Sequence, residues 1–462
     1  MALIKSISGI RGTIGGMVGE GLDPPAIVRF TAAYAAFIRR TTGLSSPRIV
    51  VGRDARLSGD MLRQLVTATL TATGCEVIDA GLATTPTVEM AVVWEKAAGG
   101  LILTASHNPC HWNALKLLNS AGEFLNAEEG AEVLDIAEKD NFRFAPVEQL
   151  GSIRHADYAQ RHIEAILRLA LVDVEAIRAA GFRVVVDTIN SVGACVLPDL
   201  LGALGIAETL LVNGTPDGRF AHNPEPLPDH LEEIAGTMAG GLFDVGFVVD
   251  PDVDRLAIIC EDGSMFGEEY TLVAVADYVF GRTSCGGAVS NLSSSRALKD
   301  VALSYGRTYQ ASAVGEVNVV ACMKATDAVI GGEGNGGVIY PELHYGRDAL
   351  VGIALFLSHL ARKGMKPSEL RRLYPACHIS KQKLELSPDT DIDAILNTLR
   401  NAYPYPVTDI DGIRIDFPDR WVHLRKSNTE PIIRIYAEAP DAAQADELAQ
   451  NVMHTIRQNA TL

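Results

Sequence analysis

Hydrophobic and polar positions follow the same order in three separate stretches of the chain. Residues 48–81, 183–212 and 288–316 each run from a short apolar segment through a polar loop into helical spacing and then a second apolar segment. Such runs predict buried strands joined by a helix that packs on one face. Each loop carries Asp or Asn and then Ser or Thr where the helix starts, and these side chains cap free amide groups. We therefore expect three similar α/β domains with mainly parallel sheets.

The C-terminal part of the chain has a different pattern. Residues 377–387, 412–427 and 431–439 alternate apolar and polar positions as strands do, while residues 391–403 and 441–460 have helical spacing. Strands that follow one another without an intervening helix favour an antiparallel sheet, so this part is predicted to be an α+β domain. The predicted domains are residues 1–155, 156–256, 257–370 and 371–462.

Length and charge narrow the possible partners. The chain has 462 residues, 47% of them hydrophobic, and a net charge of −17. This charge argues against nucleic acid or an anionic membrane, although basic residues gathered in one cleft can still bind phosphates. Seven scattered cysteines without a C-x-x-C pair fit reduced thiols. Since no long apolar run and no signal-peptide core is present, we expect a cytoplasmic protein.

The stretch TASHNP, residues 104–109, follows a predicted strand. Taken alone, Ser106 and Asn108 are more typical of a helix cap than of a catalytic site. A Ser-His-Asp triad is not favoured, because adjacent side chains rarely face each other and no G-x-S-x-G turn surrounds Ser106. A serine that carries a chemical group is the remaining interpretation, and it depends on the other loops.

Three carboxylates alternate in the stretch VVDPDVDRLAII, at Asp250, Asp252 and Asp254. In an extended loop this alternation turns them to one side, where a hard divalent cation would offset their repulsion. An EF-hand is disfavoured because Arg255 stands where such a loop needs glycine, although Glu261 matches its last ligand position. A haloacid-dehalogenase-type phosphatase would normally have Thr or Val at the position of Asp254. The pattern therefore favours a metal site over a solvated acidic turn.

Two further loops suit a sugar phosphate. GGEGNGG, residues 331–337, combines glycines with Glu333 and Asn335, which can hydrogen-bond sugar hydroxyls. RKSNTEPIIR, residues 425–434, offers guanidiniums, hydroxyls and an amide to a phosphate dianion, from Arg425, Ser427, Asn428, Thr429 and Arg434. One such loop in each predicted domain implies a shared central cleft.

Together these motifs resemble the α-D-phosphohexomutase family. TASHNP is similar to its phosphoserine loop, DPDVDR to its metal loop and RKSNTEP to its phosphate loop. SGIRG at 8–12, GRDARLSG at 52–59 and DGIRIDF at 411–417 also fit, in the same order along nearly the whole chain. The resemblance implies an isomerase that moves a phosphoryl group between C6 and C1 of a hexose phosphate, working as a monomer or homodimer.

The resemblance also implies roles for single residues. Ser106 would carry a phosphoryl group, pass it to a sugar monophosphate and recover one from the hexose 1,6-bisphosphate that forms. Mg²⁺ would be bound by Asp250, Asp252, Asp254 and an oxygen of phosphorylated Ser106. Phosphoryl transfer depends mainly on placement and on neutralised charge, which agrees with these roles.

The cationic residues near these loops are the candidates for stabilising the transferred group. They are Arg11, Lys116 and Arg255. Lys116 is also the first candidate for the proton acceptor, and His107 is the second because its ordinary pKa is nearer neutrality.

Two positions of the sugar loop depart from the pattern of many bacterial members. Asn335 stands where those members have serine, and Gly337 stands where they have histidine. The stretch GEGNGGVIYPELHYGRDAL is more similar to an archaeal-type branch that is often assigned to phosphoglucosamine mutases. We therefore expect conversion of glucosamine 6-phosphate to glucosamine 1-phosphate, with phosphomannomutase/phosphoglucomutase activity as the alternative. A metal-dependent phosphatase and a non-catalytic calcium-binding protein are the alternatives from other classes.

Overall fold

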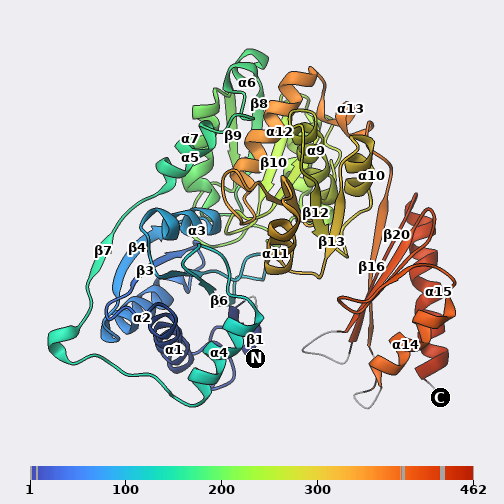
Figure 1. The fold of residues 1–462 in the computed structure, drawn as a ribbon. Coiled ribbons are helices and arrows are strands. Elements are labelled where there is room, and N and C mark those ends of the chain that lie inside the picture. Colours follow the sequence, from blue (N-terminus) through green and yellow to red (C-terminus); the bar gives the residue numbers. More distant parts are fainter. Residues whose placement is uncertain (1–2, 7–8, 386, 388–390, 427–431, 461–462) are drawn as a thin grey trace.

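Four sheets make up the protein in a computed structural model that describes residues 3–6, 9–385, 387, 391–426 and 432–460 (Figure 1). Three of them mix parallel and antiparallel strands, and the last is wholly antiparallel, which confirms the predicted fold class. Ser427, Asn428 and Thr429 lie outside the described residues. Among the described residues, no helix is both long and apolar enough to cross a membrane.

The first sheet has the strand order β1-β2-β6-β5-β3-β4-β7. Its strands are β1 (Leu3–Ser6), β2 (Gly9–Thr13), β3 (Arg48–Arg53), β4 (Glu76–Leu82), β5 (Gly99–Leu103), β6 (Trp112–Leu118) and β7 (Ile153–His155). Four α-helices accompany it: α1 (Pro24–Thr42), α2 (Gly59–Ala72), α3 (Thr85–Trp94) and α4 (Ala127–Glu138). β3 pairs in parallel with β4 and β5, so the polar loops that follow β3 and β5 leave the same edge of the sheet.

The second sheet has the order β11-β10-β8-β9. It consists of β8 (Arg183–Asp187), β9 (Glu208–Val212), β10 (Val245–Val249) and β11 (Leu256–Ile259), with α5 (Ala159–Leu167), α6 (Val174–Ala180), α7 (Gly193–Leu204) and α8 (Glu232–Ala239). β11 begins at the residue where we placed a domain boundary, and it pairs antiparallel with β10. The hairpin that encloses the aspartate loop thus belongs to the second sheet.

The third sheet has the order β13-β12-β14-β15. Its strands are β12 (Ala288–Asn291), β13 (Tyr309–Ser312), β14 (Ile330–Glu333) and β15 (Gly337–Ile339), and its helices are α9 (Glu268–Phe280), α10 (Ala297–Ser304), α11 (Glu316–Thr326), α12 (Ala349–Lys363) and α13 (Pro367–Arg371). One continuous hydrophobic core joins this unit to the second one. Phe356 on α12 makes edge-to-face ring contacts with Phe247 and Phe266, at centroid distances of 6.2 and 5.2 Å. The second and third units therefore pack as one body.

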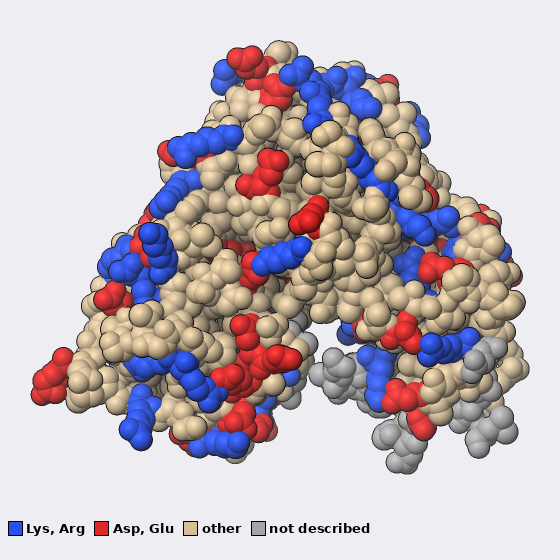
Figure 2. Space-filling model, viewed as in Figure 1, with Lys and Arg blue, Asp and Glu red and all other residues tan. Residues whose placement is uncertain are grey.

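The fourth sheet has the order β16-β20-β19-β18-β17 and a hydrophobic core of its own. It consists of β16 (His378–Glu385), β17 (Val407–Thr408), β18 (Ile413–Asp416), β19 (Trp421–Lys426) and β20 (Ile432–Ala439), with α14 (Ile392–Ala402) and α15 (Ala442–Ala460). A wide notch separates this unit from the first one in the space-filling view (Figure 2).

Polar contacts attach the fourth unit to the third. The hydroxyl of Ser293 lies 2.9 Å from Nδ1 of His423, and the amide of Val314 donates to Asp411 at 2.9 Å. Arg414 donates to a backbone carbonyl of the third unit at 2.6 Å. A unit with its own core and a polar contact surface can shift relative to its neighbour more readily than one that shares a core.

Candidate active site

Ser106 lies on the loop between β5 and β6, and no helix begins there, so the helix-cap interpretation is wrong. Its backbone has φ +48°, which an L-residue adopts rarely and which is characteristic of strained functional positions. Its amide donates to the Thr104 hydroxyl at 2.9 Å, and that hydroxyl donates to Asp54 at 2.6 Å. The side chain is buried, and its hydroxyl donates to Oδ2 of Asp250 at 2.6 Å. The serine of the first unit thus meets the aspartates of the second.

Arg56 holds this loop in shape, and sequence reasoning gave it no role. Its side chain is fully buried, and its Nε donates to Asp54 at 3.0 Å. Its two other nitrogens donate to four loop carbonyls, those of Ser106, Asn108, Pro109 and Trp112. The signal that could have found it is its position within GRDARLSG, one of the motifs already matched.

The three aspartates converge, although the loop is not extended as we expected. It is a turn in which the Val253 amide donates to the Asp250 carbonyl at 3.0 Å, and Val253 has φ +63°. Asp250, Asp252 and Asp254 are fully buried, and one carboxylate oxygen of each lies within 4.8 Å of the others. Burial and the neighbouring carboxylates Asp254 and Asp252 raise the pKa of Asp250 well above its ordinary value. Such crowding of carboxylates is offset by a divalent cation.

The hydrogen bonds of the triad leave oxygens free for an ion. Oδ2 of Asp252 accepts from Thr85 at 2.6 Å and from Lys116 at 2.7 Å, and Oδ2 of Asp254 accepts from Arg347 at 2.7 Å. The Oδ1 atoms of Asp252 and Asp254 are buried and have no hydrogen-bond partner among the described residues. A buried carboxylate oxygen without a partner is costly, so the donor set fits a hard cation such as Mg²⁺.

Lys116, on β6, is placed beside the triad. Its Nζ lies 2.7 Å from Asp252 and 3.6 Å from Asp254. Burial alone would lower the pKa of Lys116, but the charges of Asp252 and Asp254 outweigh it and raise the pKa. Lys116 is therefore a cation in this arrangement.

A group of cations surrounds His107. Burial and then the charges of Arg255, Arg347 and Arg11 lower the pKa of His107 to about 2, so its imidazole is neutral. Burial and the charge of Arg255 also lower the pKa of Arg11. Nδ1 of His107 lies 3.4 Å from the Ser106 hydroxyl. These cations next to the serine create a site of positive potential, which suits a phosphoryl group.

The sugar loop is held by buried polar contacts. Glu333, at the end of β14, accepts from the Asn291 amide at 2.8 Å, from the Gly315 backbone at 3.1 Å and from Arg347 at 2.9 Å. Burial would raise the pKa of Glu333, but the Arg347 charge and the Asn291 hydrogen bond outweigh it and lower the pKa. Asn335 lies 3.4 Å from the same carboxylate through its amide nitrogen. Glu333 is thus a charged hydrogen-bond acceptor.

The phosphate loop is described only at its two ends. Arg425 on β19 and Arg434 on β20 are cross-strand partners. Arg425 forms an ion pair with Asp411 at 2.9 Å, and Arg434 is exposed. The structure thus brings Ser106, His107, Lys116, Arg11, Arg255, the three aspartates and Glu333 to one region, while Arg425 and Arg434 lie on the fourth unit.

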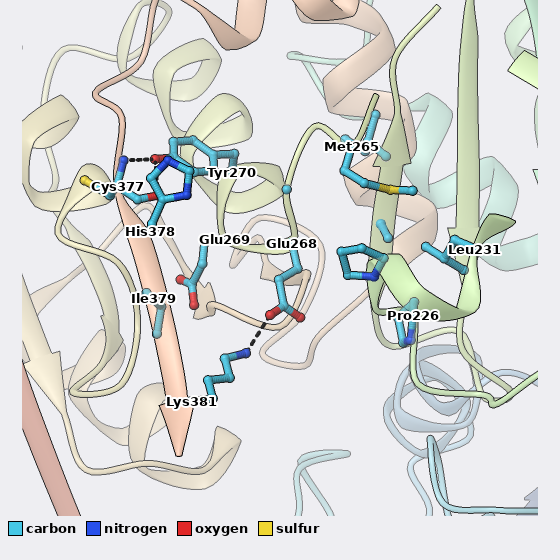
Figure 3. A pocket seen from close by; sticks show the side chains of 14 residues that line it. Pro226, Leu231, Met265, Glu268, Glu269, Tyr270, Cys377, His378, Ile379 and Lys381 are labelled. Carbon is cyan, nitrogen blue, oxygen red and sulfur yellow. Dashed lines mark hydrogen bonds and ion pairs between the residues drawn. The ribbon is translucent and has the colours of Figure 1, made fainter. Parts of the chain in front are cut away.

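A cavity lies beside the connection to the fourth unit (Figure 3). It measures about 270 Å³ and is lined by residues of the second unit, of the start of α9 and of β16. Glu268 and Lys381 form an ion pair of 2.5 Å across it, and the Cys377 amide donates to the Tyr270 hydroxyl at 2.9 Å. Among the predicted site residues that the structure describes, none lines this cavity.

Family models match nearly the whole chain. The models for domains I, II, III and the C-terminal domain of phosphoglucomutase/phosphomannomutase match residues 3–144, 160–263, 267–377 and 368–455. A Thermococcus kodakarensis protein named phosphoglucomutase/phosphomannomutase is 37% identical over 94% of this chain and 96% of its own length. A Sulfurisphaera tokodaii protein named phosphoglucosamine/phosphogalactosamine mutase is 32% identical over 98% of both chains.

Solved structures agree with these matches. A Burkholderia thailandensis phosphoglucomutase/phosphomannomutase family protein superimposes with a TM-score of 0.84 at 25% identity, over 99% of this chain and 98% of that one. An Aspergillus fumigatus N-acetylphosphoglucosamine mutase, solved with GlcNAc-6P and magnesium, shares the fold with a TM-score of 0.58 at 16% identity, over 99% and 96% of the two chains.

Proposed function

Since this chain belongs to the α-D-phosphohexomutase family and is therefore an intramolecular phosphotransferase, we propose that it interconverts glucosamine 6-phosphate and glucosamine 1-phosphate. The observation that carries the proposed mechanism is the contact of 2.6 Å between the Ser106 hydroxyl and Asp250, within a buried acidic triad. It supports Ser106 as the phosphoryl carrier and a hexose 1,6-bisphosphate as the intermediate. Family membership removes the phosphatase and the calcium-binding protein from the alternatives.

In this proposal Ser106 gives its phosphoryl group to the free hydroxyl of the bound sugar phosphate. Asp250, Asp252 and Asp254 would hold Mg²⁺, which when bound neutralises charge on the transferred group. Arg11 and Arg255 stabilise the same group from the side of His107. Arg425, Ser427, Asn428, Thr429 and Arg434 are the proposed contacts of the phosphate at the remote end of the sugar.

Proton transfer is assigned to Lys116 rather than to His107. A histidine with a pKa of about 2 is a weak base at neutral pH. Lys116 lies beside the triad and carries a proton there, so it can donate this proton to the sugar oxygen that leaves when Ser106 receives a phosphoryl group. Once it has lost that proton, it can accept one from the sugar hydroxyl in the reverse step, when Ser106 gives the phosphoryl group. The direction of each proton step depends on whether Ser106 gives or receives the phosphoryl group, and it is the same at either end of the bisphosphate.

Glu333 and Asn335 are the proposed readers of the sugar hydroxyls at C3 and C4. These hydroxyls have the same configuration in glucose, mannose and glucosamine, so Glu333→Ala should lower kcat/KM for all three phosphates. Phosphoglucomutase/phosphomannomutase activity is the second candidate, and the Thermococcus kodakarensis relative at 37% identity favours it. A cytoplasmic location and a monomeric or homodimeric state stay predictions.

Comparison of kcat/KM for the three sugar phosphates, with bisphosphate present, tests the substrate. The three sugars differ at C2, where glucosamine carries a protonated amine. Loss of a hydrogen bond to this charged group costs roughly 1.5–3 kcal/mol, so kcat/KM for glucosamine phosphate should exceed that for the other two by about ten- to a hundredfold. A preference for glucose or mannose phosphate would replace the first candidate with the second. If Glu333→Ala impaired only one sugar, the role given to this loop would be wrong.

A further inference from the structure

Arg347 joins three carboxylates that come from different parts of the site. Its guanidinium donates to Asp254 at 2.7 Å, to Glu316 at 2.8 Å and to Glu333 at 2.9 Å. The side chain is 9% exposed, and its carboxylate partners are 0–7% exposed. Hydrogen bonds between buried charges are strong and directional, and a guanidinium can make several at once because its donors form a rigid fork.

The sugar loop has a gap into which Arg347 fits. A Cβ on Gly337 would lie 2.3 Å from Cδ of Arg347, which is closer than atoms can approach. Gly337 is one of the two positions where the loop departs from the bacterial pattern, and its departure had no explanation from sequence. The absence of a side chain at Gly337 makes room for the stem of Arg347.

The contacts of Arg347 also fix how two functional carboxylates point. At Asp254 it occupies Oδ2, while Oδ1 has no hydrogen-bond partner among the described residues and only Arg255 as an ion-pair partner, at 3.9 Å. At Glu333 it occupies Oε2, while Asn291 and the Gly315 amide occupy Oε1. One side chain therefore sets the rotation of a carboxylate in the aspartate loop and of another in the sugar loop.

We propose that Arg347 is a positioning residue that links sugar recognition to metal binding, because one guanidinium orients Glu333 for the sugar and also pairs with Asp254, whose charge the metal ion needs. The proposal rests on the roles given above to Glu333 and to the aspartate triad. The two effects of Arg347 oppose each other, because the guanidinium that orients Glu333 also repels the metal ion that Asp254 would hold.

Arg347→Met should therefore move two constants in opposite directions. Without its orienting partner, Glu333 contacts the sugar less well, and KM for the hexose phosphate should rise about tenfold. Without the adjacent positive charge, Asp254 attracts a divalent cation more strongly, and Mg²⁺ should bind roughly tenfold more tightly. General damage to the site would instead weaken both.

Two measurements test this. Isothermal titration calorimetry with Mg²⁺ alone, on the sugar-free enzyme, gives the metal affinity without reference to activity, and initial rates at saturating Mg²⁺ give KM. Arg347→Lys retains the charge but not the fork, so it should keep the wild-type Mg²⁺ affinity while KM still rises. Arg307→Met is the matched control, because Arg307 is half-buried in the third unit and bonds to the Thr283 carbonyl instead.

The outcomes separate this proposal from the one on which it rests. Unchanged constants in Arg347→Met, or a parallel weakening of both in a variant that melts like the wild type, would overturn the role of Arg347. Glu333→Gln is measured in parallel: if it leaves KM unchanged, the assignment of Glu333 to the sugar fails irrespective of Arg347. If Glu333→Gln raises KM and Arg347→Met does not, only the positioning role fails.

Discussion

Replacement of Arg56 by methionine should destabilise the first unit strongly and slow catalysis at the same time. The substitution roughly retains the length of the side chain but removes five hydrogen bonds, one to Asp54 and four to loop carbonyls. It also leaves Asp54 buried with 0% exposure and without its cation. Removal of one partner of a buried ion pair costs about 3–5 kcal/mol, because the other charge is left uncompensated.

That magnitude can be measured as a melting temperature. In a domain of this size 1 kcal/mol corresponds to about 2–4 °C, so Arg56→Met should lower the transition of the first unit by roughly 6–20 °C. Arg48→Met is the control in the same unit, because its ion pair with Glu76 is 41% and 47% exposed and should contribute at most about 1 kcal/mol. Differential scanning calorimetry gives both shifts.

The double variant Asp54→Asn/Arg56→Met completes the experiment. It removes the uncompensated charge, so it should recover part of the stability lost in Arg56→Met. It should not recover kcat, since the four carbonyls of the loop that carries the strained Ser106 still lack the donor that holds the loop in place. Equal melting temperatures of Arg56→Met and Arg48→Met would refute the role given to Arg56, and so would full activity of the double variant.

Four further results are expected. Intact mass should show a species heavier by one phosphate that disappears in Ser106→Ala, and mutase turnover should fall by orders of magnitude; near-full turnover would exclude Ser106 as the carrier. Rigorous chelation should abolish activity and Mg²⁺ should restore it, whereas full activity after chelation would count against the triad as a metal site. Because the pKa of His107 lies at about 2, below its ordinary value, the imidazole is neutral across the physiological range, and His107→Gln should leave the shape of the pH–rate profile from about pH 5 to 8 unchanged; loss of an inflection near 6.5 in the variant would contradict this. X-ray scattering should report a more compact particle when a bisphosphate binds, since the fourth unit must approach the sugar held by the others; identical profiles would argue against this closure.

The fold could be predicted because its signal is local. Each α/β unit repeats an apolar run, a polar loop and an amphipathic helix, and the C-terminal strands alternate, so residue spacing alone indicates the class of each sheet. What spacing could not reveal is that α12 joins the second and third units in one core, through Phe247, Phe266 and Phe356. Such a contact depends on residues far apart in the chain, and nothing near any one of them indicates it.

The same distinction applies to the candidate site. Ser106 and the three aspartates stand in short motifs, and the residue types and their spacing in these motifs indicate the chemistry. Arg56 stands in a matched motif, but its role depends on a loop about 50 residues away, and that of Arg347 depends on carboxylates 14, 31 and 93 residues away. Their partners are known only once the chain is folded, which is why sequence reasoning assigned them no role.

The balance of charge explains why a protein with a net charge of −17 can bind a doubly phosphorylated sugar. Two groups of cations are available to the phosphates, one around His107 near the serine and one on the Arg425–Arg434 strand pair of the fourth unit. The first group faces an acidic triad, so its charge is partly neutralised until a phosphoryl group and a metal ion enter together. The second group belongs to a unit held by polar contacts, which can be exchanged for water at little cost in free energy. The phosphate at the reacting end thus meets a fixed set of charges, whereas the phosphate at the remote end meets a set that can withdraw while the bisphosphate turns.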